Sequence, residues 1–170
     1  RHLLDLIYSL HRFKMSIVNI IQDISKDWIK YRKFCEAVSK TGSNIHKVKP
    51  DHDVYELVNV KWKEEISKKV NLKKYLVDSS VGKGVLRPGP WLTIMDKSIT
   101  ESATKGYYIV YLFSSDMSGV YLSLNQGWTQ FQKRFKTKDG RIEIYKNAQA
   151  IRNLIKSAQG FSTEDIDLKP

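Results

Sequence analysis

The stretch YYIVYLFSSDMSGVYLSL, residues 107–124, decides the fold class because it holds two strand-like segments joined by a turn-like one. Residues 107–113 and 120–124 are rich in aromatic and β-branched side chains, which favour strands, and serine, aspartate and glycine separate them. The same pattern occurs earlier, at residues 75–79 and 91–95. The sequence therefore predicts consecutive β-strands from about residue 74 onward.

Helical spacing dominates before this region. Apolar residues recur every three or four positions between residues 17 and 40, and Thr-Gly-Ser-Asn at 41–44 is expected to end that helix. The residues expected on its buried face are Ile17, Ile20, Ile21, Ile24, Trp28 and Ile29. A second helix, capped by Asp51 or Asp53, is expected to bury Val54, Leu57, Val58, Trp62 and Ile66.

The last third returns to helical spacing over residues 128–135 and 144–158, with a break at Gly140. The residues expected on one face here are Ile144, Ala148, Ile151, Leu154 and Ile155. Residues 161–170 predict a closing strand or a frayed tail. Helices, then strands, then helices predict an α+β fold, with a mixed or antiparallel sheet of about four to six strands flanked by N-terminal and C-terminal helices.

The domain organisation follows from length. A chain of 170 residues can bury a sizeable core, and we expect residues 15–170 to form a single domain. Residues 1–14 carry a short amphipathic pattern ahead of Met15, which predicts an upstream helix or sequence outside the native start.

The net charge of the chain narrows the range of its possible partners. Lysine and arginine outnumber aspartate and glutamate by 29 to 18, for a formal net charge of +11 and a pI near 9.6. Such an excess favours a polyanion, either nucleic acid or an anionic membrane surface. No apolar run is long enough to span a membrane. The single cysteine, Cys35, excludes an intramolecular disulfide and fits a reducing compartment, so we expect a cytoplasmic protein.

Most catalytic constellations are missing from the sequence. The four histidines and one cysteine do not have metal-site spacing, and VGKGVL at 81–86 lacks the spacing and the Ser/Thr ligand of a phosphate-binding loop. We therefore expect no cofactor and no metal. Asp78, Asp96 and Asp116 could serve a metal-dependent nuclease if the fold brought them together, although each stands where a strand would end and where capping a turn is the commoner role of aspartate.

Residues 79–127 carry an ordered set of motifs. These are a G-x-G loop, a Pro-Trp pair opening an apolar strand, an I-T-x-S segment, G-x-Y-x-V-Y-L-F and Y-L-S-L-x-Q-G. Together they resemble the core of the McrB-like N-terminal domain, the DNA-recognition module of modification-dependent restriction systems, which serve antiviral defence. The resemblance implies binding of duplex DNA, with a modified cytosine such as 5-methylcytosine extruded into a protein pocket in the best-understood members.

The resemblance places three residues of this chain in or beside that pocket: Trp91, Tyr108 and Leu112. Aromatic and apolar walls can restore much of the stacking that an extruded base loses. Strand alternation puts Tyr108, Val110 and Leu112 on one face, and Trp91 reaches it only if its strand is a neighbour. The alternative for such an aromatic strand is ordinary packing in the core.

The Gly-rich loop before Trp91 is the second candidate contact with DNA. We expect the loop and the cations near it to face the duplex, with the cations on phosphates, at Gly82, Lys83, Gly84, Leu86, Arg87, Lys97 and Lys105. In the best-known member a bulky aromatic stands where Lys83 lies and fills the gap left by the extruded base; here Leu86 or Arg87 is the expected replacement. Many relatives also have a tryptophan where this chain has Val85-Leu86.

These observations predict a non-catalytic DNA-binding module that gives a restriction system its specificity. Its expected partners are modified double-stranded DNA and a nuclease or NTPase domain or subunit of the same system, with no membrane. Two alternatives remain: a metal-dependent nuclease domain, and a protein-assembly module whose basic charge is incidental.

Overall fold

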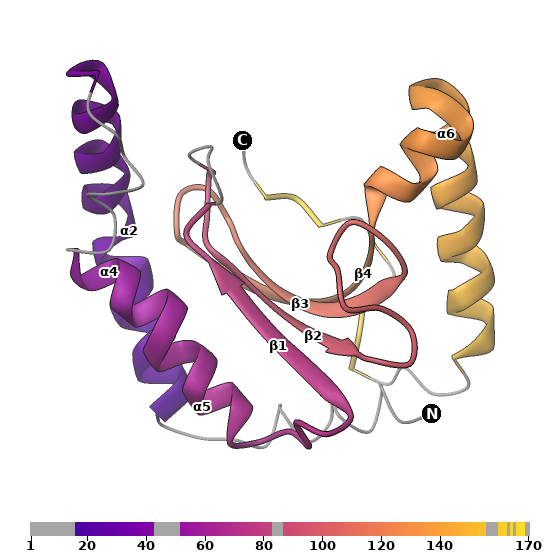
Figure 1. Ribbon diagram of the computed structural model, residues 1–170, viewed down its shortest axis with the longest axis horizontal. Coiled ribbons are helices and arrows are strands. Elements are labelled where there is room, and N and C mark those ends of the chain that lie inside the picture. The colour runs from indigo at the N-terminus through magenta and orange to yellow at the C-terminus, as the bar shows by residue number, and fades with distance from the viewer. Residues whose placement is uncertain are drawn as a thin grey trace.

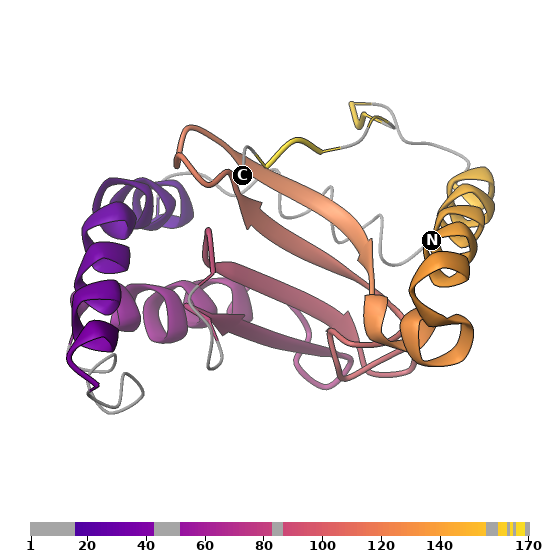
Figure 2. The ribbon, with the colours of Figure 1, turned by 90° about the horizontal axis from the view of Figure 1, so that it is seen from above.

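A computed structural model describes residues 16–42, 52–82, 87–155, 160–162, 164 and 166–168. The N-terminal extension expected at 1–14 lies outside these residues. The chain forms helices, then a sheet, then a helix, as the α+β prediction required. Figure 1 shows the first helices along one side of the sheet and the last helix on the other, and Figure 2 shows the same three parts from above.

The sheet has four strands in sequence order within the described residues: β1 (Tyr75–Ser80), β2 (Trp91–Asp96), β3 (Tyr107–Phe113) and β4 (Val120–Gln126). Every neighbouring pair is antiparallel. All four predicted strands are confirmed, and of the two predicted sheet types the antiparallel one forms. Short connections make this possible, because antiparallel neighbours can be joined by turns and loops without a crossover helix.

Helix α2 (Ser16–Lys40) confirms the first predicted helix and ends just before Gly42, whose φ of 75° a residue with a side chain rarely adopts. Ile17, Ile24 and Trp28 are buried as expected, but the expectation for Ile29 is wrong because its side chain is 43% exposed. The buried face instead continues through Tyr31 and Cys35, which follow Trp28 at helical spacing.

The second predicted helix is one continuous helical segment, made of α4 (Asp53–Glu56), η2 (Leu57–Trp62) and α5 (Lys63–Ser67). Its N-cap is His52, whose Nδ1 accepts a hydrogen bond from the backbone N–H of Val54 at 3.2 Å. The prediction of an aspartate cap is therefore wrong for Asp53, which is the first helical residue, and Asp51 lies outside the described residues. The η2 part is a π-helix, a wider turn than the sequence pattern indicated.

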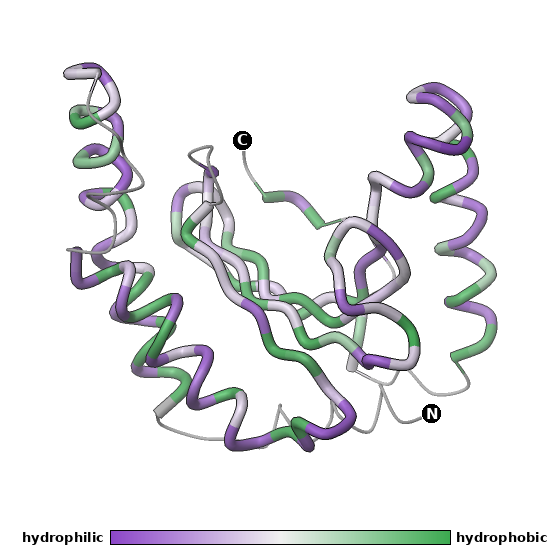
Figure 3. Tube along the Cα trace, in the orientation of Figure 1, coloured by the Kyte–Doolittle hydropathy of each residue, from purple (hydrophilic) through white to green (hydrophobic). Residues whose placement is uncertain are grey.

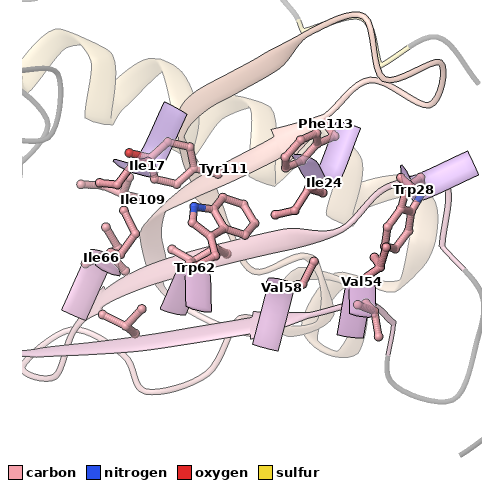
Figure 4. Packing of buried hydrophobic residues seen from close by; sticks show 14 of the residues in the cluster. Ile17, Ile24, Trp28, Val54, Val58, Trp62, Ile66, Ile109, Tyr111 and Phe113 are labelled. Atoms are coloured by element: carbon pink, nitrogen blue, oxygen red, sulfur yellow. The ribbon is translucent and has the colours of Figure 1, made fainter. Parts of the chain in front are cut away.

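The main core lies between these helices and one face of the sheet (Figure 4). Val54, Val58, Trp62 and Ile66 recur every four residues and are fully buried. The Trp62 ring meets the Tyr111 and Phe113 rings edge-on, each at a centroid distance of 5.6 Å. Burial raises the pKa of Tyr111 to about 12, so its hydroxyl is neutral in this core.

Helix α6 (Trp128–Leu154) is a helical hairpin, because its backbone reverses at Lys136, where φ is 63°. The predicted break at Gly140 is wrong. Gly140 lies inside the second arm, where a Cβ would come within 3.1 Å of the Phe131 backbone, so its missing side chain lets the two arms touch. Leu154, expected on the apolar face, is 80% exposed.

The described residues of the C-terminal tail form no strand or helix, although the Leu168 carbonyl accepts a hydrogen bond from the Ser115 N–H at 2.8 Å. The closing-strand prediction for 161–170 is therefore not met in the described part of that tail. None of the described helices is long and apolar enough to cross a membrane.

Candidate nucleic-acid interface

The face of the sheet opposite the main core carries the three predicted pocket residues. Trp91 of β2 stands directly across from Leu112 of β3, so both side chains point to the same side. Tyr108 and Val110 share that side by alternation along β3. We call this surface the Trp91 face; its strand residues are Leu76, Asp78, Ser80, Trp91, Thr93, Met95, Tyr108, Val110, Leu112, Tyr121, Ser123 and Asn125.

The centre of the Trp91 face is apolar and its margins are polar. Met95, Tyr108 and Val110 form a small buried cluster, and Trp91 and Leu112 pack against it half-buried. Serine, aspartate and asparagine side chains stand on the two outer strands, β1 and β4. A flat base could stack on the half-buried aromatic side chain and find hydrogen-bonding groups at the margins.

Tyr108 lies deeper than Trp91. Its side chain is 6% exposed, and its hydroxyl donates a hydrogen bond to the Ala103 carbonyl at 2.9 Å. Burial raises the pKa of this hydroxyl, which therefore stays neutral at physiological pH. The β2–β3 loop thus holds the Tyr108 ring in one orientation, as a support beneath Trp91 and Leu112.

Both ends of the Gly-rich loop are anchored to the main core. At its start, Val81 is buried and the Gly82 N–H donates to Ser80 Oγ at 2.9 Å, with φ of 111° at Gly82. At its end, the Pro88 carbonyl accepts from Trp28 Nε1 at 2.8 Å. A Cβ on Gly89 would come within 3.2 Å of Phe113, so this position also packs tightly.

Apart from Gly82, which belongs to the anchored start of the loop, the predicted loop contacts divide into three groups. Lys83, Gly84 and Leu86 lie outside the described residues, while Arg87 is exposed at the anchored end of the loop. Lys97 follows the far end of β2, and Lys105 precedes β3 at that same end. The six residues of β2 separate these two lysines by about 17 Å from the described ends of the loop, so neither lysine lies beside those ends.

Local contacts explain where these two lysines lie. Lys97 Nζ donates to the Leu72 carbonyl at 2.8 Å, beside the edge strand β1. The backbone of Lys105 lies against Gly127, where any Cβ would overlap the Thr104 and Lys105 main chain. Lys105 therefore stands at the base of α6, and phosphate binding by either lysine remains a prediction.

The three aspartates of the nuclease alternative do not form a site. Asp96 accepts from the Ser98 N–H at 2.9 Å and its hydroxyl at 2.6 Å, and Asp116 accepts from Ser118 in the same way. Both therefore cap turns, as expected. Asp78 lies 3.9 Å from Lys63 Nζ. In the described part of the chain no three His, Cys, Asp or Glu side chains are placed to share a metal ion.

Two features of the site had little signal in the sequence. The Trp28–Pro88 hydrogen bond joins residues 60 positions apart, and no local pattern reports such a contact. The α6 hairpin gathers cations and aromatic residues along a groove of about 560 Å³ beside the end of β4. Its basic residues are visible in the sequence, but the reversal at Lys136 that gathers them is not.

These features define a basic α+β domain with an aromatic patch next to an anchored loop. The family model described as the MrcB-like, N-terminal domain matches residues 39–170, and the chain belongs to that family. This confirms the resemblance read from residues 79–127. The family match supports a role as a DNA-binding module in a restriction system. Comparison with curated proteins and with solved structures gave no match.

Proposed function

We propose that this domain reads modified cytosine in duplex DNA by extruding the base onto the Trp91 face. The modified base stacks on Trp91, with Leu112 at its side and Tyr108 supporting both from below. The domain supplies specificity, and a nuclease or NTPase domain or subunit of the same restriction system supplies cleavage.

The observation that carries this proposal is the pairing of Trp91 with Leu112 across β2 and β3. Extruding a base costs a few kcal/mol in lost stacking and pairing, which an aromatic ring and an apolar wall can partly restore. Trp91 is half-buried, so one part of its ring packs on the sheet while the rest remains accessible. A ring held in this way keeps its orientation when a base arrives, which reduces the entropy lost on binding.

The loop before Trp91 fits the same proposal. Its two ends are anchored through Val81 and Pro88, so Arg87, next to the second anchor, meets DNA from a fixed base. Arg87 is exposed and available for a phosphate, in keeping with the net charge of +11. The side chain that fills the vacated place in the duplex is Leu86 or Arg87 rather than Lys83, because a lysine cannot stack as a ring does.

The test compares Trp91→Ala and Trp91→Phe with the unchanged domain. Each protein is titrated with duplexes that carry 5-methylcytosine, 5-hydroxymethylcytosine or plain cytosine in otherwise identical sequence, at two salt concentrations. We expect Trp91→Ala to reduce the preference for the modified duplex by about five- to 150-fold, since stacking on an aromatic side chain is worth about 1–3 kcal/mol per base. Trp91→Phe should keep most of the preference.

Tyr55→Ala is the matched control, because Tyr55 is a half-buried aromatic residue on α4, on the other side of the sheet. It should leave the preference unchanged. A duplex with 2-aminopurine next to the modified cytosine reports extrusion as a rise in fluorescence. An unchanged preference in Trp91→Ala would remove Trp91 from the pocket, and the absence of any salt-sensitive DNA binding would favour the protein-assembly alternative.

A further inference from the structure

The α6 hairpin is the most basic element of the described chain. Figure 3 shows hydrophilic residues along both of its arms. Its two acidic residues, Asp139 and Glu143, are outnumbered by its cations, which are Lys133, Arg134, Lys136, Lys138, Arg141, Lys146 and Arg152. Four of these cations stand within six residues at the reversal, where Lys136 turns the chain. The hairpin therefore concentrates positive charge at one exposed site.

Most of this charge is not neutralised by the residues that the structure describes. Among the described residues, Lys146 pairs with Glu143 at 2.7 Å, but none of the other six cations of α6 forms an ion pair. Like charges this close repel each other, and the repulsion destabilises the free protein. A polyanion bound at the hairpin would remove that repulsion.

One face of the second arm, the part of α6 that follows Lys136, has side chains suited to binding a ligand. Arg141, Tyr145, Ala148 and Arg152 are spaced by four, three and four residues, so they share one face of the helix and line the groove between the arms. The two arginines stand about 16 Å apart along the axis. Tyr145 lies between them and is 59% exposed. A guanidinium group binds a phosphate in a bidentate manner, and this spacing places the two guanidinium groups in line along the helix.

Hydrogen bonds hold the hairpin in place against the sheet. The Gln126 side chain at the end of β4 donates to the Ile144 carbonyl at 3.2 Å and accepts from Asn147. In the first arm, Gln130 Oε1 accepts from the Gly106 N–H at 3.1 Å, and the Gln130 backbone N–H donates to the Thr104 carbonyl at 3.1 Å. These contacts with the sheet and the β2–β3 loop therefore fix both arms.

The hairpin lies on the same side of the sheet as the Trp91 face. The main core and helices α2 and α4–α5 occupy the opposite side, as both Figure 1 and Figure 2 show. A rod-shaped ligand that lies against the Trp91 face therefore has the hairpin beside it.

We propose that the α6 hairpin binds the phosphate backbone of the duplex, through Arg141 and Arg152 in the groove and the cations at the reversal. This inference rests on the proposed function for its ligand, but it assigns a second surface with a different role. The hairpin supplies affinity for any sequence and modification state, whereas Trp91 supplies discrimination. Arginines placed along a line suit the regular charges of a duplex better than the irregular acidic patch of a protein.

The experiment measures the salt dependence of binding for Arg141→Gln/Arg152→Gln, with modified and with plain duplex. Each phosphate contact adds about 0.9 to the slope of log affinity against log salt, so the double variant should lose about 1.8 from the slope. Between about 50 and 200 mM salt, the fall in affinity should then be about tenfold smaller than for the unchanged domain. The ratio of affinities for modified and plain DNA should not change.

Two further variants make the result specific. Lys26→Gln/Lys33→Gln removes the same charge from exposed positions of α2, on the far side of the sheet, and should leave the slope as it is. Arg141→Lys/Arg152→Lys keeps the charge and should retain most of the slope, which excludes simple misfolding as the cause. Thermal unfolding of each variant is measured in parallel.

The outcomes separate this inference from the proposed function. A slope that is equal in the Arg141/Arg152 double variant and in the unchanged domain overturns the hairpin's role, even if Trp91 still confers the preference. An equal loss in the Lys26/Lys33 control also overturns it, because net charge alone would then explain the effect. A reduced slope with no modification preference in any protein supports the hairpin and contradicts base reading at Trp91.

Discussion

The two faces of the sheet differ in chemistry although the same four strands supply both. The core face presents large apolar side chains, such as Ile94, Ile109 and Phe113, which are almost completely buried. The Trp91 face mixes a small apolar cluster with Thr93, Ser123 and other polar residues. Burial explains the first pattern. The polar residues of the Trp91 face give up stability that a wholly apolar face would provide, and this cost fits the recognition role that we propose for it.

The largest expected effect tests the core face. Trp62→Ala should lower the free energy of unfolding by about 4 kcal/mol, because Trp62 is fully buried and its loss leaves a cavity beside Tyr111 and Phe113. Trp91→Ala should cost about 1–2 kcal/mol, since that side chain is half-buried. Chemical denaturation measures both. Equal losses would mean that the two faces contribute alike to stability.

The next effect tests the link between the core and the loop. Trp28→Phe removes ring volume and the hydrogen bond to the Pro88 carbonyl, and should cost about 2 kcal/mol. It should also speed proteolysis within residues 81–90. Trp62→Phe is the control, because the Trp62 indole N–H is buried without a partner among the described residues. It removes the same volume without breaking a bond, so a larger loss in this control would contradict the anchoring role of Trp28.

A smaller effect is expected at the support beneath the Trp91 face. Tyr108→Phe should cost about 1 kcal/mol, because it removes the hydroxyl that donates to the Ala103 carbonyl. The ring remains, so the preference for modified duplex should stay within about twofold of the unchanged domain. A large loss of preference with unchanged stability would instead give the Tyr108 hydroxyl a direct contact with the base.

The smallest effect depends on pH. Hydrogen bonds from Ser98, and then the charge of Lys74, hold the pKa of Asp96 below its usual value, although burial opposes them. Because the folded pKa is lowered, this stabilisation is present above the unfolded pKa of about 3.9 and is lost as pH falls through the folded value.

Asp96→Asn should therefore cost about 0.5–1 kcal/mol at about pH 7, because both Ser98 bonds go to Oδ1 and the amide oxygen can still accept them, but without the negative charge. The difference should shrink toward zero as pH falls through the lowered pKa of the folded Asp96, because the native carboxyl then becomes neutral as well. Unfolding curves at several pH values measure it. A difference that does not change with pH would mean that the carboxylate charge contributes nothing.

Elements governed by local pattern were predictable. The strand at residues 107–113 matches β3 to the residue, because its flanking glycine and serines stop the pattern sharply. The predictions fail where a contact with a residue distant in the chain determines the local structure. Gly140 looked like a helix break because glycine weakens helices in isolation, yet packing against Phe131 requires it there. His52 replaces aspartate as a cap, and its ring also packs against Tyr31 and Phe34.

The sequence by itself determined the fold class, the order of the strands along the chain, the basic charge, the family and the sharing of one face by Tyr108 and Leu112. Charge and motifs can be read directly from the residues. The elements and the shared face depend on residues close together in the chain, because the backbone period decides which face of a helix or strand each side chain points to. Only the tertiary structure decided that Trp91 joins that face, that Lys97 and Lys105 stand far from the described ends of the loop, and that α6 folds back into a basic hairpin. These depend on which strands pair and where the chain reverses, and contacts between distant residues set both.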